Sequence, residues 1–453
     1  MPESEKTASQ PQAAQSESAG FNPADLNTSL RELWTLADNV RYLNHGSFGP
    51  SPIVVQEAAR RWTDRLEQQP MQFFLREMEH ALDEATERLG QFLGTKGQHL
   101  AFVENATVGM NVVAASVVLA ADDEVLLTDH EYGAVQRIWK NACRAAGARA
   151  VICPLPDPPT AIAARTAEPS DTGATEPAAG GDSADSSRAA DDADDEATVR
   201  AVVDAITPRT KLLILSHVSS PTARVLPVAA ICRAARKRGV QVCIDGPHAV
   251  AMLPVHLKDI GCEYYVASCH KWLCGPFGSG FLYAAPRVQS QIRPILTSWG
   301  GSLSGRAPHW KDEFRWFGTH NPARFLAVAD AIEFMEQRGL DLFRQRSAAL
   351  LDHARERLTA VTGLVHSPMP ACRISPVMQT FPLPAAPEPP PAPGQRDALQ
   401  LQLQEQHAIE IPVIHFQGQR MLRVSCHLYN TRDEIDILAD ALEHALQQER
   451  NRR

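Results

Sequence analysis

Short apolar runs alternate with amphipathic segments along most of the chain. Apolar runs that fit buried strands recur at 99–103, 124–128, 150–153, 211–216, 242–244, 264–267 and 281–283. Segments with apolar residues at helical spacing lie between them, at 52–66, 71–93, 104–119, 134–146, 197–205 and 227–238. Alternation of strands and helices predicts an α/β domain built on a mostly parallel sheet.

The rest of the chain has the pattern of a smaller α+β domain. Helices are expected at 322–337, 340–358, 395–406 and 431–447, and strands near 377–381, 409–412 and 421–425. One more helix is expected near the start, at 26–37, where leucines and a tryptophan give an apolar face. We therefore expect a large domain over 23–300 and a small domain over 301–453.

Three segments fall outside this pattern. Residues 1–22 are polar and aperiodic, which predicts a disordered tail. Residues 157–196 are rich in Pro, Ala, Gly, Ser and Asp and contain no aromatic residue, which predicts a disordered acidic insertion at the surface. Residues 382–393 are rich in proline and predict a second surface loop.

Composition excludes several classes of protein. The insertion carries eleven acidic residues against two arginines, which accounts for the whole net charge of −9. The remainder is close to neutral and predicts no nucleic-acid-binding surface. Nine cysteines occur singly, without a C-x-x-C pair, so we expect no metal site and no disulfide framework. No apolar run approaches the ~20 residues of a membrane span, and the N-terminus lacks signal-peptide features, so a cytoplasmic chain is expected.

Candidate chemistry concentrates in residues 241–280. One apolar run ends on Asp245, and a second is followed by Ser-Cys-His-Lys-Trp, which contains Lys271. The carboxyl ends of neighbouring strands form ligand sites in α/β sheets. A lysine amine forms a Schiff base with an aldehyde, and a carboxylate keeps a pyridine ring protonated, so the pair suits pyridoxal 5'-phosphate. The alternative is a buried salt bridge beside a glycine turn.

Polar neighbours of this pair favour the cofactor interpretation. Ser268 and His270 flank the lysine, where a hydroxyl and an imidazole can donate hydrogen bonds to a phosphate. His248 follows Asp245 by three residues and shares its side if a helical turn follows the strand. Such a D-x-x-H and S-x-H-K-W combination, followed by glycines, is not expected of a simple salt bridge.

With these motifs the sequence resembles the class V aminotransferase family of pyridoxal-phosphate enzymes, from about Tyr42 to the C-terminal helix. Its isopenicillin N epimerase-like branch is the most similar in appearance. The resemblance implies the aspartate aminotransferase-like fold (fold type I), an amino-acid substrate and a homodimer.

The resemblance also implies roles for residues outside the central stretch. A phosphate cup is expected at the helix start that carries Thr107, although Ala106 stands where many relatives have a second hydroxyl. Tyr132 is expected to stack on the pyridine ring, with His130 as the second choice. An ordinary helix cap and a packed tyrosine are the alternatives.

Further implied residues lie in the second half of the chain. Ser220 is expected to face the phenolic oxygen of the cofactor, with Thr222 less favoured; a plain Ser-Pro turn is the alternative. Thr319, in a Gly-Thr pair, is expected to reach the phosphate of the other subunit. Arg423 is expected to grip the α-carboxylate of the substrate, because a guanidinium pairs with a carboxylate through two hydrogen bonds. The alternative is a surface ion pair.

The family carries a similar N-H-G-S-F-G segment near its active-site entrance, so the resemblance implies an entrance here, with His45 contacting the substrate. A tight loop before a helix is the alternative. Residues of the C-terminal segment are expected to line the same mouth: His427, Tyr429 and Asn430. In the epimerase-like branch an arginine near position 76, here Arg76, helps to hold the substrate.

The reaction is not fixed by these motifs. Lys271 is placed to move the Cα proton, a step that racemisation, transamination and β-elimination share. Racemisation also needs a proton donor on the opposite ring face, for which Tyr132, His130 and His45 are candidates. Cysteine desulfurases use a cysteine shortly before the carboxylate-binding arginine, but residues 395–422 contain none and the nearest upstream is Cys372.

We therefore expect an epimerase-like enzyme acting at Cα of an amino acid or a peptide that ends in one. The alternatives are a C–S lyase or aminotransferase and, from another class, a non-catalytic binding protein on the same fold.

Overall fold

A seven-stranded sheet forms the centre of the structure, which is a computed structural model that describes residues 26–156, 183–365, 373–392 and 394–452. The strand order is β2-β8-β7-β6-β5-β3-β4. β8 pairs antiparallel with both neighbours, and the other pairs are parallel. This confirms the predicted mostly parallel sheet. The strands are β2 (Leu100–Val103), β3 (Glu124–Thr128), β4 (Arg149–Cys153), β5 (Thr210–Ser216), β6 (Gln241–Asp245), β7 (Tyr264–Ser268) and β8 (Gly280–Ala284).

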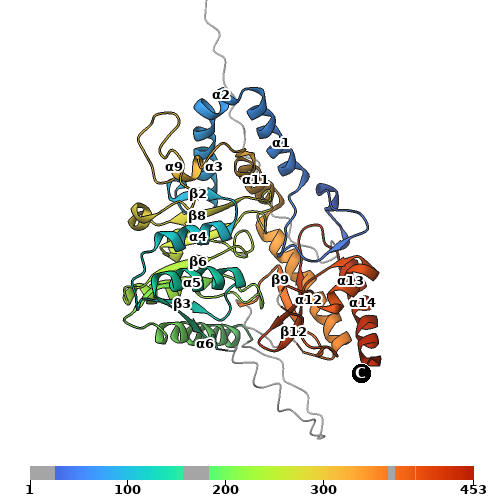
Figure 1. Ribbon diagram of the computed structural model, residues 1–453. Coiled ribbons are helices and arrows are strands. Elements are labelled where there is room, and N and C mark those ends of the chain that lie inside the picture. The colour runs from blue at the N-terminus through green and yellow to red at the C-terminus, as the bar shows by residue number, and fades with distance from the viewer. Residues whose placement is uncertain (1–25, 157–182, 366–372, 393, 453) are drawn as a thin grey trace, which may run out of the picture.

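Helices cover this sheet, as the two faces of a parallel sheet require. In Figure 1, α4 and α5 lie across the strands, and α1 to α3 rise above β2. Every residue of β3, β7 and β8 is buried. The helices are α1 (Ile53–Gln68), α2 (Pro70–Gln72), α3 (Met78–Phe92), α4 (Ala106–Ser116), α5 (Gly133–Ala146), α6 (Ser183–Asp204), α7 (Val228–Lys237), α8 (Leu257–Ile260), α9 (Asp312–Arg315), α10 (Ala323–Leu326) and α11 (Val328–Arg338).

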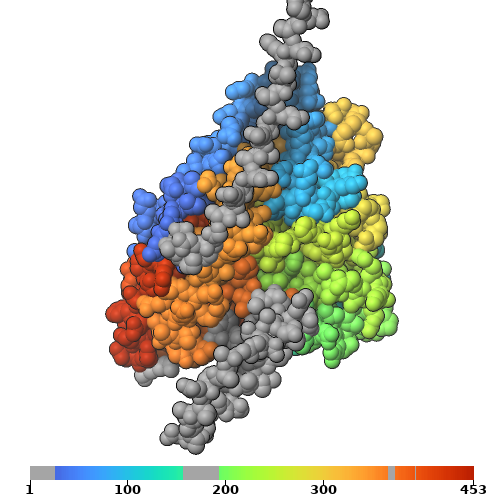
Figure 2. Space-filling view, turned by 180° about the vertical axis from the view of Figure 1, so that it is seen from behind, coloured from blue at the N-terminus to red at the C-terminus, as the bar shows by residue number. Residues whose placement is uncertain are grey.

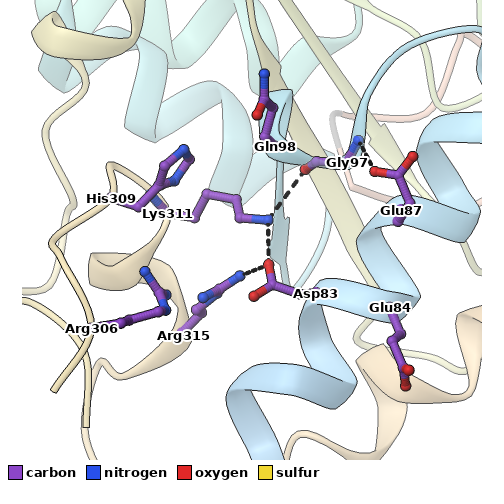
Figure 3. Close-up of a pocket in the computed structure, with 9 residues that line it drawn as sticks. All are labelled: Asp83, Glu84, Glu87, Gly97, Gln98, Arg306, His309, Lys311 and Arg315. Atoms are coloured by element: carbon purple, nitrogen blue, oxygen red, sulfur yellow. Dashed lines mark hydrogen bonds and ion pairs between the residues drawn. The ribbon is translucent and has the colours of Figure 1, made fainter. Parts of the chain in front are cut away.

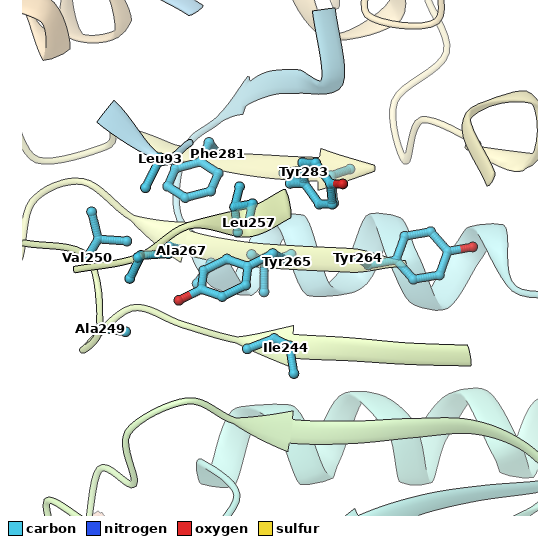
Figure 4. Packing of buried hydrophobic residues seen from close by; sticks show 14 of the residues in the cluster. Leu93, Ile244, Ala249, Val250, Leu257, Tyr264, Tyr265, Ala267, Phe281 and Tyr283 are labelled. Atoms are coloured by element: carbon cyan, nitrogen blue, oxygen red, sulfur yellow. The ribbon is translucent and has the colours of Figure 1, made fainter. Parts of the chain in front are cut away.

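The core on the sheet consists of large side chains from neighbouring strands. Tyr265 of β7 and Phe281 of β8 are fully buried and stack with their ring centroids 6.1 Å apart, as Figure 4 shows. Each fully buried side chain of this size contributes about 1.5–3 kcal/mol of hydrophobic stabilisation. The tight packing holds the carboxyl ends of the strands at fixed positions.

A smaller part follows, with a three-stranded antiparallel sheet of order β11-β12-β9. Figure 1 shows it beside the large sheet, and Figure 2 shows from behind the orange and red chain against the green and yellow half. It has its own hydrophobic cluster. Its elements are α12 (Leu340–Thr362), β9 (Met378–Pro382), α13 (Ala398–His407), β10 (Ile409–Glu410), β11 (Val413–Phe416), β12 (Gln419–Ser425) and α14 (Arg432–Asn451).

The two parts are joined near the start of the chain. Strand β1 (Arg41–Tyr42) pairs in parallel with β10 of the smaller part. The hydrophobic cluster of the large sheet also takes in Phe325 of α10 and Ile332 of α11, although both lie beyond residue 300. The domain boundary expected there stays a prediction.

The helix expected at 26–37 is wrong. The segment forms a short 3-10 helix, Arg31–Leu33, and then runs in extended form. Trp34 pairs with Pro52 in an antiparallel bridge, and its indole N–H donates to the carbonyl of Pro50 at 3.1 Å. These tertiary contacts outweigh the local helical preference.

The disorder expected over 157–196 is partly wrong. Residues 157–182 lie outside the described residues, as does the tail 1–22, but α6 already begins at Ser183. Asp194 of this helix is 1% exposed and forms an ion pair with Arg224. The acidic composition suggested a solvated segment. Instead, buried arginines of other segments pair with its acids: Arg224 with Asp194 and Arg373 with Asp195. The proline-rich loop expected at 382–393 begins one residue later, because Pro382 is the last residue of β9; residues 383–392 contain neither helix nor strand.

Candidate active site

The carboxyl ends of β6 and β7 carry the central pair of residues. β6 ends at Asp245, which lies opposite Val266 of β7. Lys271 follows β7, and its Nζ lies 2.9 Å from Nε2 of His248. The Asp245 carboxylate interacts electrostatically with the lysine amine. The structure thus brings together the acid, the imidazole and the amine that the sequence motifs singled out.

Burial shifts the ionisation of this group. Desolvation raises the pKa of Asp245 to about 7, against the opposing effect of Lys271. Desolvation and the positive charge of Arg423 lower the pKa of Lys271 to about 7. The pKa of His248 lies well below its ordinary value, because the ring is buried beside two cations. A neutral amine at physiological pH is what a nucleophilic lysine requires.

The start of helix α4 lies against the end of β7. The backbone N–H of Ala106 donates to Oγ of Ser268 at 3.0 Å, and the side chain of Asn105 caps the helix by accepting from Val108. Thr107 is exposed in the first turn. The N-terminal end of a helix attracts anions through its free N–H groups and its dipole. Ser268 uses its oxygen as an acceptor here, and its O–H remains able to donate.

Arg423 of β12 reaches this region from the smaller part. Its guanidinium donates to the carbonyl oxygen of Ser220 at 2.7 Å, to Oγ of Ser220 at 3.1 Å and to Oγ of Ser47 at 2.7 Å. The side chain is 4% exposed and lies near Tyr132. Burial lowers the pKa of Arg423 to about 10. Oxygen acceptors without negative charge therefore hold this cation, so it is not the surface ion pair weighed as the alternative.

The other predicted residues differ in their exposure and in their partners. Tyr132 is 53% exposed at the start of α5. His130 is buried and bonded to Asp129 at 2.7 Å, so its ring is held by that carboxylate. Thr222 donates to Ser219. Thr319 is exposed, and no hydrogen bond joins its side chain to another described residue.

The structure corrects the expectation that His45, His427, Tyr429 and Asn430 line an entrance. His45, His427 and Asn430 are 0% exposed and Tyr429 is 1% exposed, so none of them lines a mouth. They are buried because segments far apart in the sequence fold over one another. Arg76 is exposed in a π-helical turn, Phe73–Glu77, and donates to Gln72.

Sequence analysis missed Glu131. It follows β3, and its carboxylate accepts from the Thr128 hydroxyl and from the backbone N–H and hydroxyl of Ser216. Burial and the nearby Asp245 raise the pKa of Glu131 to about 7. The available signal was an acid three residues after the end of β3, between His130 and Tyr132.

A strongly charged cavity of about 450 Å³ lies away from these residues. Figure 3 shows Lys311 and Arg315 pointing at Asp83 of α3. The amine of Lys311 lies 3.0 Å from that carboxylate and also donates to the carbonyl of Gly97. Lys311 and Arg315 of this cavity thus form ion pairs with Asp83. None of the predicted site residues lines the cavity.

Comparison with known proteins identifies the family. The chain matches the sequence model described as "Aminotransferase class-V" over residues 41–161 and 184–438. The chain belongs to the class V aminotransferase family. It is 34% identical to isopenicillin N epimerase of Amycolatopsis lactamdurans, over 91% of this chain and 97% of that one. It is 33% identical to isopenicillin N epimerase of Streptomyces clavuligerus, over 88% and 94%.

Solved structures of other enzymes have the same fold. The cysteine desulfurase CsdA of Escherichia coli is 20% identical with a TM-score of 0.69, over 95% of this chain and 99% of that one. The structure of a complex of the cystine C–S lyase C-DES is 20% identical in sequence with a TM-score of 0.68, over 90% of this chain and 98% of that one. Class V aminotransferases are pyridoxal-phosphate enzymes, so the resemblance, the fold and the cofactor inferred from the sequence are confirmed. No described helix is both long and apolar enough to cross a bilayer.

The residues at the strand ends fit this cofactor. The buried nitrogen atoms without a hydrogen-bond partner among the described residues include three of this site: Nδ1 of His248, Nδ1 of His270 and Nε of Arg423. A buried polar atom normally has a partner, so these three remain available to a ligand. The Asp245 carboxylate likewise accepts no hydrogen bond from a described side chain. The segments that follow β6 and β7, with Arg423 of β12, thus offer donors, an acid and an amine to a ligand.

Proposed function

We propose that this class V enzyme inverts the Cα of an amino acid, or of a peptide that ends in one, in the manner of an epimerase. The observation that supports pyridoxal-phosphate chemistry at Cα is the group formed by Asp245, His248 and Lys271, with Arg423 close enough to lower the pKa of the lysine. The two isopenicillin N epimerases, which match nearly the whole chain, support this direction.

Lys271 is the residue we propose to bond covalently to the aldehyde of pyridoxal phosphate. Asp245 would face the ring nitrogen, and His248 would lie against the ring. When bound, the cofactor withdraws electrons from Cα of the substrate and so acidifies the Cα–H bond. The lowered pKa of Lys271, about 7, leaves a large fraction of its amine unprotonated and able to attack near neutral pH.

The phosphate end of the cofactor would lie at the start of α4. The groups proposed to bind it are the first turn of that helix with Ala106 and Thr107, the Ser268 hydroxyl and the His270 ring. Thr319 is proposed to reach the phosphate of a second subunit, which makes the active form a homodimer.

Substrate binding is proposed to centre on Arg423. Its guanidinium is held by neutral oxygens of Ser220 and Ser47, so an incoming carboxylate is the first negative charge it would meet. Charge-assisted hydrogen bonds of this kind are about twice as strong as neutral ones. Ser220 would then serve both the arginine and the phenolic oxygen of the cofactor.

Inversion requires proton transfer on both faces of Cα. The Lys271 amine would take the proton on its own face. His45 is excluded from the opposite face because it is fully buried and burial lowers its pKa to about 3. His130 is held by Asp129. Tyr132, exposed and close to Arg423, is the donor that we propose.

A C–S lyase or an aminotransferase is the alternative. A persulfide-forming desulfurase is disfavoured, because every cysteine within the described ranges is buried, whereas such a nucleophile must be accessible. Cys372 lies outside those ranges.

The test is a screen of L- and D-amino acids and short peptides in heavy water. Exchange of the α-proton with loss of optical purity, and without keto acid or sulfide, is the expected result. Release of sulfide or stoichiometric keto acid would instead assign a lyase or an aminotransferase.

A further inference from the structure

A fully buried cluster lies directly behind Lys271. It consists of His45, Cys274, His427 and Tyr429, which are 0–1% exposed. They come from three distant segments: the loop before α1, the loop after β7 and the segment before α14. Such a meeting of the first, middle and last parts of the chain at one lysine calls for a physical reason.

Metal binding does not explain the cluster. Ligand atoms of His45, Cys274 and His427 lie within 4.8 Å of one another. The two imidazole rings, however, stack with centroids 4.1 Å apart and only 20° between their planes. A metal ion lies in the plane of each imidazole that binds it at about 2 Å. Two nearly parallel stacked rings cannot both direct a lone pair at one ion.

Hydrogen bonds explain the cluster better. Nε2 of His45 lies 3.0 Å from the backbone carbonyl oxygen of Lys271, which can only accept. Nε2 therefore carries the proton, and Nδ1 accepts from the Tyr429 hydroxyl at 2.9 Å. Burial lowers the pKa of His45 to about 3, so the ring stays neutral. The result is a directed chain from Tyr429 through His45 to the lysine backbone.

Close backbone packing fixes this chain in place. A Cβ on Gly49 would lie 2.5 Å from Nε2 of His45 and 2.6 Å from the carbonyl oxygen of His270. Only glycine allows this approach of the N-terminal loop to the lysine segment. The same carbonyl of Lys271 also accepts from the backbone N–H of Cys274 at 2.8 Å, so the lysine backbone is held from two sides.

We propose that His45, oriented by Tyr429, is a positioning residue for Lys271. It fixes the lysine backbone so that the amine stays in the buried site beside His248 and Asp245. This inference rests on the proposed role of Lys271. Loss of the bond would let the amine move toward solvent, where it would be protonated more easily.

The test compares His45→Leu with His45→Gln. The amide N–H of glutamine replaces the Nε2 donor, whereas leucine fills the space without one. The readout is the pH midpoint for acetylation of Lys271 in the cofactor-free enzyme, measured by peptide mass spectrometry. In His45→Leu the midpoint should rise by about 0.5 pH units or more, because a less buried amine is easier to protonate. In His45→Gln it should stay within about 0.3 units of the wild type.

Two further variants keep the test decisive. Tyr429→Phe removes one hydroxyl and should also raise the midpoint. It provides the test if His45→Leu does not fold. His353→Leu removes a histidine on α12 that bonds to Asp436, and it should leave the midpoint unchanged. A wild-type midpoint in folded His45→Leu and Tyr429→Phe would overturn the inference. If wild-type enzyme saturated with pyridoxal phosphate and then treated with borohydride carries no label on Lys271, the proposed function is overturned instead.

Discussion

Removal of the carboxylate of Asp194 should destabilise the enzyme strongly. Asp194 and Arg224 are 1% and 3% exposed. One guanidinium nitrogen, Nη2, lies 3.0 and 3.2 Å from the two carboxylate oxygens and also donates to Thr198 at 2.9 Å. Asp194→Ala leaves a buried cation whose remaining partners among the described residues are Thr198 and the carbonyl of Pro156. Breaking a buried pair from one side costs roughly 3–5 kcal/mol.

Equilibrium urea unfolding, followed by circular dichroism, measures this loss. Asp352→Ala is the matched control, because its pair with Arg355 is exposed at 63% and 35% and is worth about 0–1 kcal/mol. Asp194→Leu combined with Arg224→Met should recover most of the stability, since no buried charge is then left unpaired. Equal losses in Asp194→Ala and Asp352→Ala would refute the account of α6 as a structural helix.

Three further predictions concern the site. Arg423→Gln should lower kcat/KM for carboxylate-bearing substrates by roughly 30-fold or more, mainly through KM, because a buried charge pair is lost; an unchanged KM would remove Arg423 from substrate binding. Tyr132→Phe should retain α-proton exchange in heavy water but lose inversion, and persistent inversion by NMR and chiral chromatography would exclude Tyr132 as donor. The Lys271 amine has a pKa of about 7 and is mostly neutral above that pH. The rate of cofactor attachment should therefore increase as pH rises through about 7. A midpoint of this rate increase near the pKa of an exposed lysine, about 10.4, would contradict the prediction.

Much of the fold could be predicted from local patterns. The central strands are continuous apolar runs because helices cover both faces of a parallel sheet, and this signal survives in any window of the sequence. The short strand β11 was missed, since Val413–Phe416 contains a histidine and borders a turn. The long helix expected at 322–337 is interrupted at Ala327, between α10 and α11. No glycine or proline at that point of the sequence indicates the break.

The site divides in the same way. Asp245, His248 and Lys271 lie in one short stretch, so strand ends and spacing sufficed to bring them together. His45 was expected at an entrance because the family carries a similar glycine-containing segment there. Those glycines instead allow close packing against the lysine segment, and only the contact with Tyr429, almost 400 residues later, reveals this.

The most direct test of the central claim is to locate the cofactor bond. The enzyme is saturated with pyridoxal phosphate, reduced with borohydride, digested and analysed by mass spectrometry. We predict a single modified peptide that carries the reduced cofactor on Lys271, and no modified peptide in Lys271→Ala. A label on another lysine, or an unchanged label in Lys271→Ala, would contradict the account.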